Sequence, residues 1–185
     1  FSGPSGTGKS LAAQLAADIL GMNLVSVNVT GVTEELIEAR LRGFAKGSFT
    51  GAIEETDGWF GKADGNILFL DEFQNAPEHI QTQLLDLVSA NSDRVNLSRL
   101  GQENKPNSYQ VKLILALNEQ IEELIEKKKF RKDLFYRIRR IIDFPSLNEV
   151  LKPENNKARK GLDRNTYIQI LLKIYQWRHS MLFMG

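Results

Sequence analysis

The sequence predicts an α/β fold in which a parallel sheet carries helices on both faces. Segments rich in β-branched or apolar residues, at 24–29, 67–70 and 111–117, alternate with segments of helical spacing. The segment 67–70 is apolar throughout, as expected of a parallel strand that is buried on both faces. A glycine-rich loop at 3–10 precedes a helical run, and loops of this kind join a strand to a helix in nucleotide-binding α/β folds.

The other elements follow from local signals along the chain. Gly21 ends a helix over 11–20, and Thr33 caps another over 34–41. Pro77 opens a helix whose apolar side chains recur with helical spacing, which indicates core packing. Further along, the sequence predicts a hairpin or long insertion over 94–109, short helices over 119–127 and 132–137, and a last strand over 139–144 that Pro145 stops.

Length and composition fit one domain. The chain has 185 residues, and its 24 basic and 23 acidic residues leave a net charge of +1, which gives no indication of a surface that coats nucleic acid or membranes. It has no cysteine, which excludes disulfides, thiolate metal sites and thiol catalysis. No apolar run approaches the roughly 18 residues of a membrane span, and no signal-peptide pattern opens the chain, so we expect a soluble, cytoplasmic protein.

The chain divides into a core over 1–145 and a different region over 146–185. In the second region, the polar segment 152–165 is typical of a linker, and the apolar residues of 168–175 have the spacing of a short amphipathic helix. The chain opens at Phe1, directly before the glycine-rich loop. We therefore expect the strand that feeds this loop to be incomplete.

The loop at 3–10 carries the first chemical motif. It matches the pattern G-x-x-x-x-G-K-[ST] at every fixed position, with the residues Gly3, Pro4, Ser5, Gly6, Thr7, Gly8, Lys9 and Ser10. The backbone N–H groups of such a loop point at phosphates, the Lys9 ammonium reaches the β- and γ-phosphates, and the Ser10 hydroxyl can hold magnesium. The alternative is a glycine-rich turn that caps an ordinary helix. Because every fixed position matches, we predict a nucleotide site.

Two adjacent carboxylates follow the apolar segment 67–70. In folds with a phosphate loop the nucleotide lies beyond the carboxyl ends of the strands, so Asp71 and Glu72 are expected to face the phosphates. Asp71 can then bind magnesium, and Glu72 can act on an attacking water. A hydrolase must activate water and a kinase must exclude it, so the pair favours an ATPase over a phosphotransferase. The alternative is that both acids only begin the turn before the helix at Pro77.

The segment Gly47-Ser48-Phe49-Thr50-Gly51-Ala52 resembles the GAFTGA loop of sigma-54-dependent transcriptional activators, the bacterial enhancer-binding AAA+ ATPases, with Ser48 in place of the usual alanine. The segment 58–72 resembles the part of the family's sequence that leads into the strand ending in its two acidic residues. The segment 130–138 resembles the family's F-R-x-D-L-x-x-R-L segment. The resemblance covers roughly 1–145 and implies an AAA+ core. The family's small helical lid has no counterpart after Leu147, so we expect a divergent or truncated lid.

The resemblance implies roles for two asparagines. Asn28 matches the residue that holds the glutamate, here Glu72, in a waiting orientation until the γ-phosphate is sensed. Asn118 matches the polar sensor residue at the end of a neighbouring strand. Leu117 stands where the family usually has a threonine, which is a departure from the pattern of that sensor.

The resemblance also implies that Arg131 and Arg137 are arginine fingers, which a subunit inserts into its neighbour's site to stabilise charge on the transferring phosphoryl group. Such trans-acting groups require a ring, expected to be a homo-oligomeric hexamer. The alternative is that the basic residues of 127–140 form a solvated face. We expect that alternative for the lysines and favour fingers for the two arginines, because Arg suits planar phosphate recognition.

In the family, the hexapeptide loop stands out from the ring pore and grips the sigma factor. The resemblance therefore implies that the partner-binding residues are Gly47, Ser48, Phe49, Thr50, Gly51 and Ala52, and that the insertion at 94–109 supports them. In an anonymous loop, an aromatic such as Phe49 would instead pack into the core. We expect His79 and Trp59 to be structural.

Together these inferences predict an ATP-hydrolysing sigma-54 interaction domain that uses ATP and magnesium and remodels the sigma-54 RNA polymerase holoenzyme to activate transcription. Contact with DNA is expected only through domains outside this chain, and contact with a membrane is not expected. Two alternatives stay open: another AAA+ remodelling ATPase, and a non-hydrolysing module that binds ATP or the sigma factor. Glu72 and the two arginines argue against the second, and the Phe49-Thr50 loop argues against the first.

Overall fold

A three-stranded parallel sheet forms the centre of the protein. The computed structural model describes residues 1–49, 51–88, 94–138 and 140–145. The sheet has the order β1–β2–β5, with the strands Leu24–Asn28, Ile67–Asp71 and Lys112–Leu115. The first four residues of the central strand, β2, are buried, because this apolar strand has packing on both faces. Asn28 lies opposite Asp71, so polar residues meet where the strands end.

The first residues of the chain extend this sheet beyond β5. Ser2 forms isolated parallel bridges with Leu117 on one side and with Asp143 on the other. The Leu117 N–H donates to the Phe1 carbonyl over 2.8 Å, which joins this short stretch to the end of β5. The strand expected over 139–144 is therefore wrong in extent: among its described residues the pairing consists of the bridge at Asp143.

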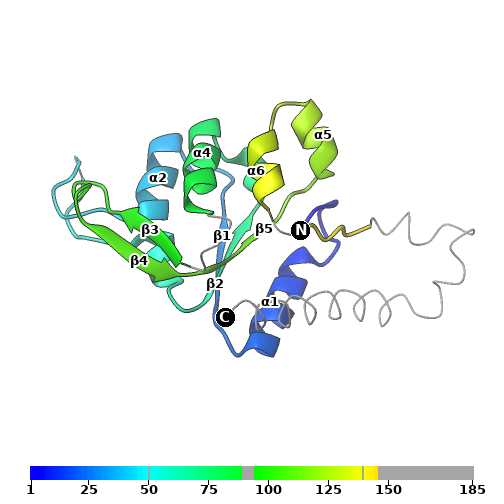
Figure 1. Ribbon diagram of the computed structural model, residues 1–185, viewed down its shortest axis with the longest axis horizontal. Helices are drawn as coiled ribbons and strands as arrows, with labels where there is room; N and C mark the ends of the chain where they lie inside the picture. The colour runs from blue at the N-terminus through cyan, green and yellow to red at the C-terminus, as the bar shows by residue number, and fades with distance from the viewer. Residues whose placement is uncertain (50, 89–93, 139, 146–185) are drawn as a thin grey trace, which may run out of the picture.

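Helices cover both faces of the sheet, as the sequence predicts (Figure 1). On one face lies α1, which spans Lys9–Leu20. On the other face lie α2 (Glu34–Arg42), α4 (Glu78–Leu87), α5 (Ile121–Glu126) and α6 (Lys132–Arg137). Two short elements, α3 (Gly58–Lys62) and the 3-10 turn η1 (Phe73–Asn75), were not expected from the sequence. The α/β class is confirmed.

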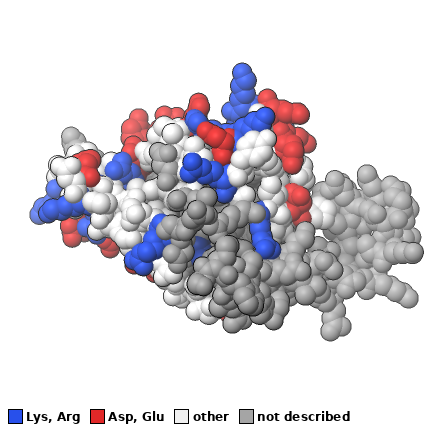
Figure 2. All heavy atoms as spheres, in the orientation of Figure 1, with Lys and Arg blue, Asp and Glu red and all other residues white. Residues whose placement is uncertain are grey.

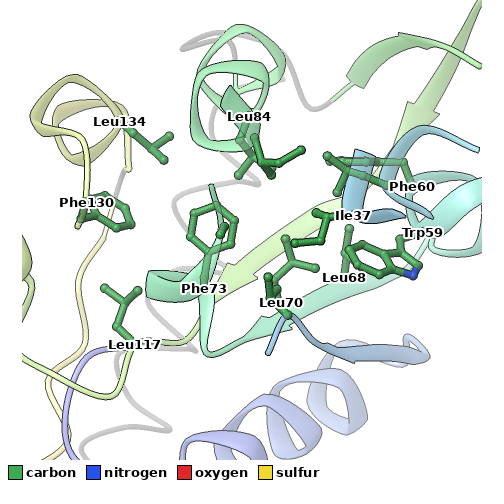
Figure 3. Close-up of a cluster of buried hydrophobic side chains, with 14 of the residues drawn as sticks. Ile37, Trp59, Phe60, Leu68, Leu70, Phe73, Leu84, Leu117, Phe130 and Leu134 are labelled. Atoms are coloured by element: carbon green, nitrogen blue, oxygen red, sulfur yellow. The ribbon is translucent and has the colours of Figure 1, made fainter. Parts of the chain in front are cut away.

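The two faces are packed with side chains of different size. The buried stripe of α1 consists of alanines, Ala12, Ala13, Ala16 and Ala17, which let the helix approach the sheet closely. The opposite face holds the main core, where large side chains from β2, η1 and the helices meet (Figure 3). This cluster includes Phe60, Leu68, Leu70, Phe73, Leu84, Phe130 and Leu134. Trp59 is also buried in it, which confirms the structural role expected for that residue.

The region 94–110 is an antiparallel hairpin, formed by β3 (Arg94–Ser98) and β4 (Pro106–Gln110). The sequence predicts a hairpin or a long insertion over 94–109, and the structure shows the hairpin. It lies beside the loop 43–57, and the two project together from the body of the protein, away from the N-terminus (Figure 1). The glycine-flanked hexapeptide is part of that projection.

Charged side chains are dispersed over the surface. On the face shown in Figure 2, acidic and basic side chains are interspersed, in line with a net charge of +1. Within the described residues, none of the helices is long and apolar enough to cross a membrane. The linker and the amphipathic helix expected within 146–185 lie outside the described part of the chain.

Candidate nucleotide site

The phosphate-binding loop turns directly into α1. Gly8 has a φ of 93°, a left-handed conformation that a residue with a Cβ rarely adopts, and it caps the first turn of the helix. The Thr7 hydroxyl donates to the Pro4 carbonyl over 2.9 Å, which closes the loop on itself. This shape places the free N–H groups of a helix N-terminus at the mouth of the loop, where they can bind an anion.

Lys9 lies inside the loop, with only 6% of its surface exposed. Its ammonium donates to the Gly3 carbonyl over 2.6 Å and to the Pro4 carbonyl over 2.7 Å. Burial lowers the pKa of Lys9, while the charges of Asp71 and Glu72 act in the opposite direction. The cation is thus held at the centre of the loop by neutral carbonyl oxygens that a phosphate could replace.

A cleft of about 250 Å³ adjoins the loop. Its lining comes from three places in the sequence: the loop with the first turn of α1, the end of β2, and the end of the β5 segment. The lining residues are Ser5, Gly6, Gly8, Lys9, Ser10, Leu11, Asp71, Glu72 and Asn118. The structure therefore brings together the phosphate loop, the acidic pair and Asn118, as the sequence predicts for a nucleotide site. Asn28, Arg131 and Arg137 are not among the residues that line it.

Ser10 and Asp71 face each other across this cleft. The Ser10 hydroxyl lies 3.4 Å from Asp71 Oδ2, although the two residues are 61 positions apart in the chain. The other oxygen, Asp71 Oδ1, accepts from the backbone N–H of Glu72 over 2.9 Å, which orients the carboxylate. A hydroxyl and a carboxylate are oxygen ligands of the kind that magnesium prefers, so this pair fits a magnesium ion.

Glu72 leaves the end of β2 in a strained conformation. Its φ of 54° is left-handed and uncommon for a residue other than glycine, and such outliers occur often at functional sites. The Thr30 hydroxyl donates to Glu72 Oε2, and Asn75 Nδ2 lies 3.4 Å from the same oxygen. Hydrogen bonds from Thr30, and then from Asn118, lower the pKa of Glu72. The carboxylate is therefore ionised at neutral pH, as a base that acts on water must be.

The partner of Glu72 differs from the one expected. Asn28 was expected to hold this carboxylate, but its Oδ1 accepts the backbone N–H of Thr30 over 2.7 Å. Thr30, two residues further on, makes the contact instead, because the turn after β1 brings its hydroxyl to the end of β2. Thr30 and Asn75 were missed because neither belongs to a motif; the available signal was a short polar residue in the turn that follows each strand.

Asn118 lies where the sequence places it, just beyond β5 and against the cleft. Its backbone N–H is 3.3 Å from the side-chain oxygen of Gln74, in η1. The position of Asn118 is thus tied to the turn that follows Glu72.

The two arginines lie at opposite ends of α6 and have different environments. Arg131 binds Asp133 with two nitrogens, at 3.0 and 2.7 Å, and also reaches Glu78 of α4 at 3.1 Å. Arg137 is exposed, and its guanidinium donates to the Leu85 carbonyl over 3.2 Å. Both arginines therefore join α6 to α4, Arg131 through the Glu78 carboxylate and the exposed Arg137 through the Leu85 carbonyl.

The lysines before α6 behave as a solvated face. Lys127 pairs with Glu119 and Glu123, and Lys129 lies 4.0 Å from Glu119. These pairs are exposed and contribute little to stability. The expectation that these lysines serve as surface charges agrees with this arrangement.

The hexapeptide loop lies on the projecting part of the protein. The N–H of Gly47 donates to the carbonyl of Ala52 over 2.8 Å, so the two ends of the loop meet. Phe49 is 42% exposed, and its ring packs edge-on against Phe44 at 4.9 Å between centroids. The alternative that Phe49 enters the core does not hold. Thr50 lies outside the described residues.

The hairpin holds the base of this loop. Phe44 bridges to Leu100, in the turn of the hairpin, and the N–H of Ala45 donates to the Leu100 carbonyl over 3.0 Å. Arg99, beside it, pairs with Asp57 and lies 3.7 Å from Glu55. The support that the sequence predicts for the loop is therefore present as backbone and ionic contacts.

Ser48 stands at the same contact between loop and hairpin. Its hydroxyl is buried and has no hydrogen-bond partner among the described residues. A Cβ at Gly101 would lie 2.8 Å from the Ser48 Cβ, so glycine is needed on the hairpin side for this approach.

Comparisons with known proteins give a consistent result. The profile of the sigma-54 interaction domain matches residues 1–142. The Sigma54-dependent transcriptional activator SfnR of Pseudomonas putida is 39% identical over 139 residues, which are 74% of this chain and 37% of SfnR. The DNA-binding transcriptional regulator NtrC of Escherichia coli strain K12 is 35% identical over 153 residues, which are 80% of this chain and 32% of NtrC.

Among solved structures, NtrX from Brucella abortus in complex with ATP is similar, with a TM-score of 0.63 and 29% identity; the match covers 79% of this chain and 32% of NtrX. The complex of NtrX with ADP has a TM-score of 0.61 at the same identity. The chain thus spans about a third of the length of the proteins it resembles.

Proposed function

The chain belongs to the sigma-54 interaction domain family of AAA+ proteins, and on this premise we propose that it is an ATPase whose cycle remodels the sigma-54 RNA polymerase holoenzyme and so activates transcription. SfnR is a sigma-54-dependent transcriptional activator, NtrC is a DNA-binding transcriptional regulator, and NtrX has been crystallised with ATP. We carry nucleotide chemistry and sigma-54 activation over to this chain because its own residues suit both tasks.

The observation that carries the proposal is the cleft in which the motif residues converge. Lys9, Asp71 and Glu72 come from separate parts of the sequence and line one cavity of about 250 Å³. Phosphoryl transfer to water needs a cation, one carboxylate that binds magnesium and a second carboxylate that activates the attacking water. A capping turn alone would not require the second acid.

Magnesium and ATP fit the residues present. Ser10 and Asp71 would hold magnesium, and Lys9 would exchange its carbonyl partners for phosphate oxygens. When bound, magnesium supplies neutralisation of charge on the β- and γ-phosphates. The backbone N–H groups of the loop would bind the remaining phosphate oxygens.

Glu72 would accept a proton from the attacking water. Its carboxylate lines the cleft and is ionised at neutral pH, so it has a free electron pair for the proton. Asn118 lies against the same cleft and donates to Glu72, which suits a residue that reports on the γ-phosphate. Asn28 would act on Glu72 indirectly, because it fixes the turn that brings Thr30 to the carboxylate.

The arginines would complete the site across a subunit boundary. Arg137 suits this task because it is exposed and outside the cleft of its own chain, and it would exchange its bond to the Leu85 carbonyl for one to the neighbour's nucleotide. Arg131 would orient α6 and could join the contact only by leaving Asp133 and Glu78. A group that completes the site from a neighbour requires a ring, and we propose a hexamer.

The hexapeptide loop would deliver the force to the sigma factor. It projects with the hairpin away from the N-terminus, where the phosphate loop lies (Figure 1). Phe49 is half exposed and Ile53 is exposed, so the projection offers apolar contacts to a partner. Chemistry and partner contact are therefore carried by separate parts of the chain, and they should be separable by mutation.

A pair of assays on one preparation tests this proposal. We expect Thr50→Ala to leave ATP turnover within a few fold while it abolishes both binding to sigma-54, trapped with a transition-state analogue, and open-complex formation. Thr33→Ala is the matched control, because it makes the same change at an exposed residue before α2 and should preserve both readouts. The proposal fails if Thr50→Ala activates like the parent, or if the parent binds sigma-54 in no nucleotide state.

A further inference from the structure

A small polar cluster lies beside the acidic pair and outside the sequence motifs. The Thr30 hydroxyl, two residues beyond β1, donates to Glu72 Oε2. Asn75 Nδ2, in η1, donates to Thr30 Oγ1 over 2.9 Å and lies 3.4 Å from Glu72 Oε2. These three side chains form a triangle of hydrogen bonds beyond the ends of two neighbouring strands, and Glu72 also accepts from Asn118.

The hydrogen bonds determine where the Thr30 proton points. A hydroxyl has one hydrogen to donate and can accept through its lone pairs. Because Thr30 Oγ1 accepts from Asn75, its own hydrogen is directed at the Glu72 carboxylate. The backbone of Thr30 is fixed as well, since its N–H donates to Asn28 Oδ1 over 2.7 Å. Thr30 is thus fixed both through its backbone and through its hydroxyl.

The bonds from Thr30 and Asn75 fall on one carboxylate oxygen. Both act on Oε2, so they fix the direction of the carboxylate without occupying Oε1. Glu72 held in this way lines the nucleotide cleft together with Lys9. We propose that Thr30, braced by Asn75, is a positioning residue that aims the Glu72 carboxylate at the attacking water. The inference rests on the proposed function, in which Glu72 acts on that water.

Turnover of ATP by the full chain gives the first test. Thr30→Val preserves the shape of the side chain and removes the hydroxyl, so we expect kcat to fall about tenfold while KM stays within about twofold. Thr30→Ser keeps the hydroxyl and should restore kcat to within about twofold of the parent. Thr33→Val is the matched control, because Thr33 makes no capping bond with its side chain, and it should leave kcat unchanged.

Removing the brace gives a second variant, which keeps the test open if Thr30→Val does not fold. Asn75→Ala leaves the Thr30 hydroxyl in place but frees its direction, so we expect a smaller fall in kcat, about threefold, again with little change in KM.

Unfolding in urea gives a readout that needs no nucleotide. In a double-mutant cycle with Glu72→Ala, the shift in midpoint that Thr30→Val causes should shrink by about half or more when the carboxylate is already absent. Equal shifts in both backgrounds would show that the hydroxyl does not stabilise Glu72.

The outcomes separate this inference from the function it rests on. An unchanged or raised kcat in Thr30→Val, in a protein whose turnover Glu72→Gln still removes, overturns the positioning role and leaves the ATPase standing. A raised kcat in particular would mean that Thr30 restrains Glu72. If the parent has no turnover that Glu72→Gln removes, the proposed function fails, and the positioning role fails with it.

Discussion

Replacing Gly58 by alanine should damage the base of the projecting loop. Gly58 opens α3 and crosses the backbone at Gly43, which ends α2. A Cβ at Gly58 would lie 2.2 Å from the Gly43 nitrogen and 2.6 Å from the Arg42 carbonyl carbon. Both are backbone atoms, so no side-chain rotation can relieve the contact. The φ of Gly58, +66°, is also one that an alanine adopts with difficulty.

The cost of the left-handed backbone and the cost of the steric overlap can be added, because one arises within the residue and the other from its contact with the backbone at Gly43. A left-handed backbone costs a residue with a Cβ roughly 1–2 kcal/mol. Forcing extra volume into a packed site costs roughly 1–3 kcal/mol. We therefore expect Gly58→Ala to lower the free energy of unfolding by about 2–5 kcal/mol. A loss of that size is a large share of the stability of a domain.

Gly65→Ala is the control that separates the two terms. Gly65 has a φ of +73°, but a Cβ there would meet nothing within 4 Å, so its alanine variant should lose only about 1–2 kcal/mol. Urea unfolding followed by circular dichroism measures both variants against the parent. The comparison holds if the dependence of the unfolding free energy on urea concentration is the same in all three proteins. If Gly58→Ala lowers the free energy of unfolding no more than Gly65→Ala does, the backbone at the crossing can move apart at little cost, and the expected steric penalty is refuted.

Three further predictions concern the nucleotide site and its completion by a neighbouring subunit. Lys9→Ala should weaken ATP binding about a hundredfold or more, since hydrogen bonds to charged groups contribute roughly 1.5–3 kcal/mol each. Glu72→Gln should bind ATP like the parent and lower turnover about a hundredfold to ten-thousandfold; equilibrium binding and steady-state turnover check both, and equal loss of binding in the two variants would contradict their assigned roles. Arg137→Ala should keep ATP affinity but lose turnover, and mixing it with Lys9→Ala should restore part of it; a mixture that never exceeds the sum of its components would speak against action in trans.

Much of the candidate site could be predicted because its signals are local. The loop from Gly3 to Ser10 carries its chemistry in consecutive residues, and the apolar strand before Asp71 and Glu72 identifies their position at a strand end. That these elements converge follows from a general property of parallel sheets, whose carboxyl ends meet at one edge. The structure agrees, since these residues line a single cleft.

Elements that depend on distant partners were harder to foresee. The strand expected over 139–144 has suitable residues, but a strand exists only where another backbone pairs with it, and among the described residues that pairing is the bridge between Asp143 and Ser2. The short helix α3 was missed because its sequence, with Gly58 and Gly61, has weak helix propensity, and burial of Trp59 and Phe60 stabilises it instead.

The partner of Glu72 shows the same limit within the site. By itself, the sequence determined the α/β class, the phosphate loop and the acidic pair, because each follows from consecutive residues and their periodicity, and its resemblance to the family pointed to Asn118. Only the tertiary structure decided that Thr30 holds Glu72 and that Arg131 is engaged with α4. These contacts join residues 42 and 53 positions apart. Side-chain hydrogen bonds depend on differences of less than an ångström in how two strands or two helices pack, which no local pattern of residues specifies.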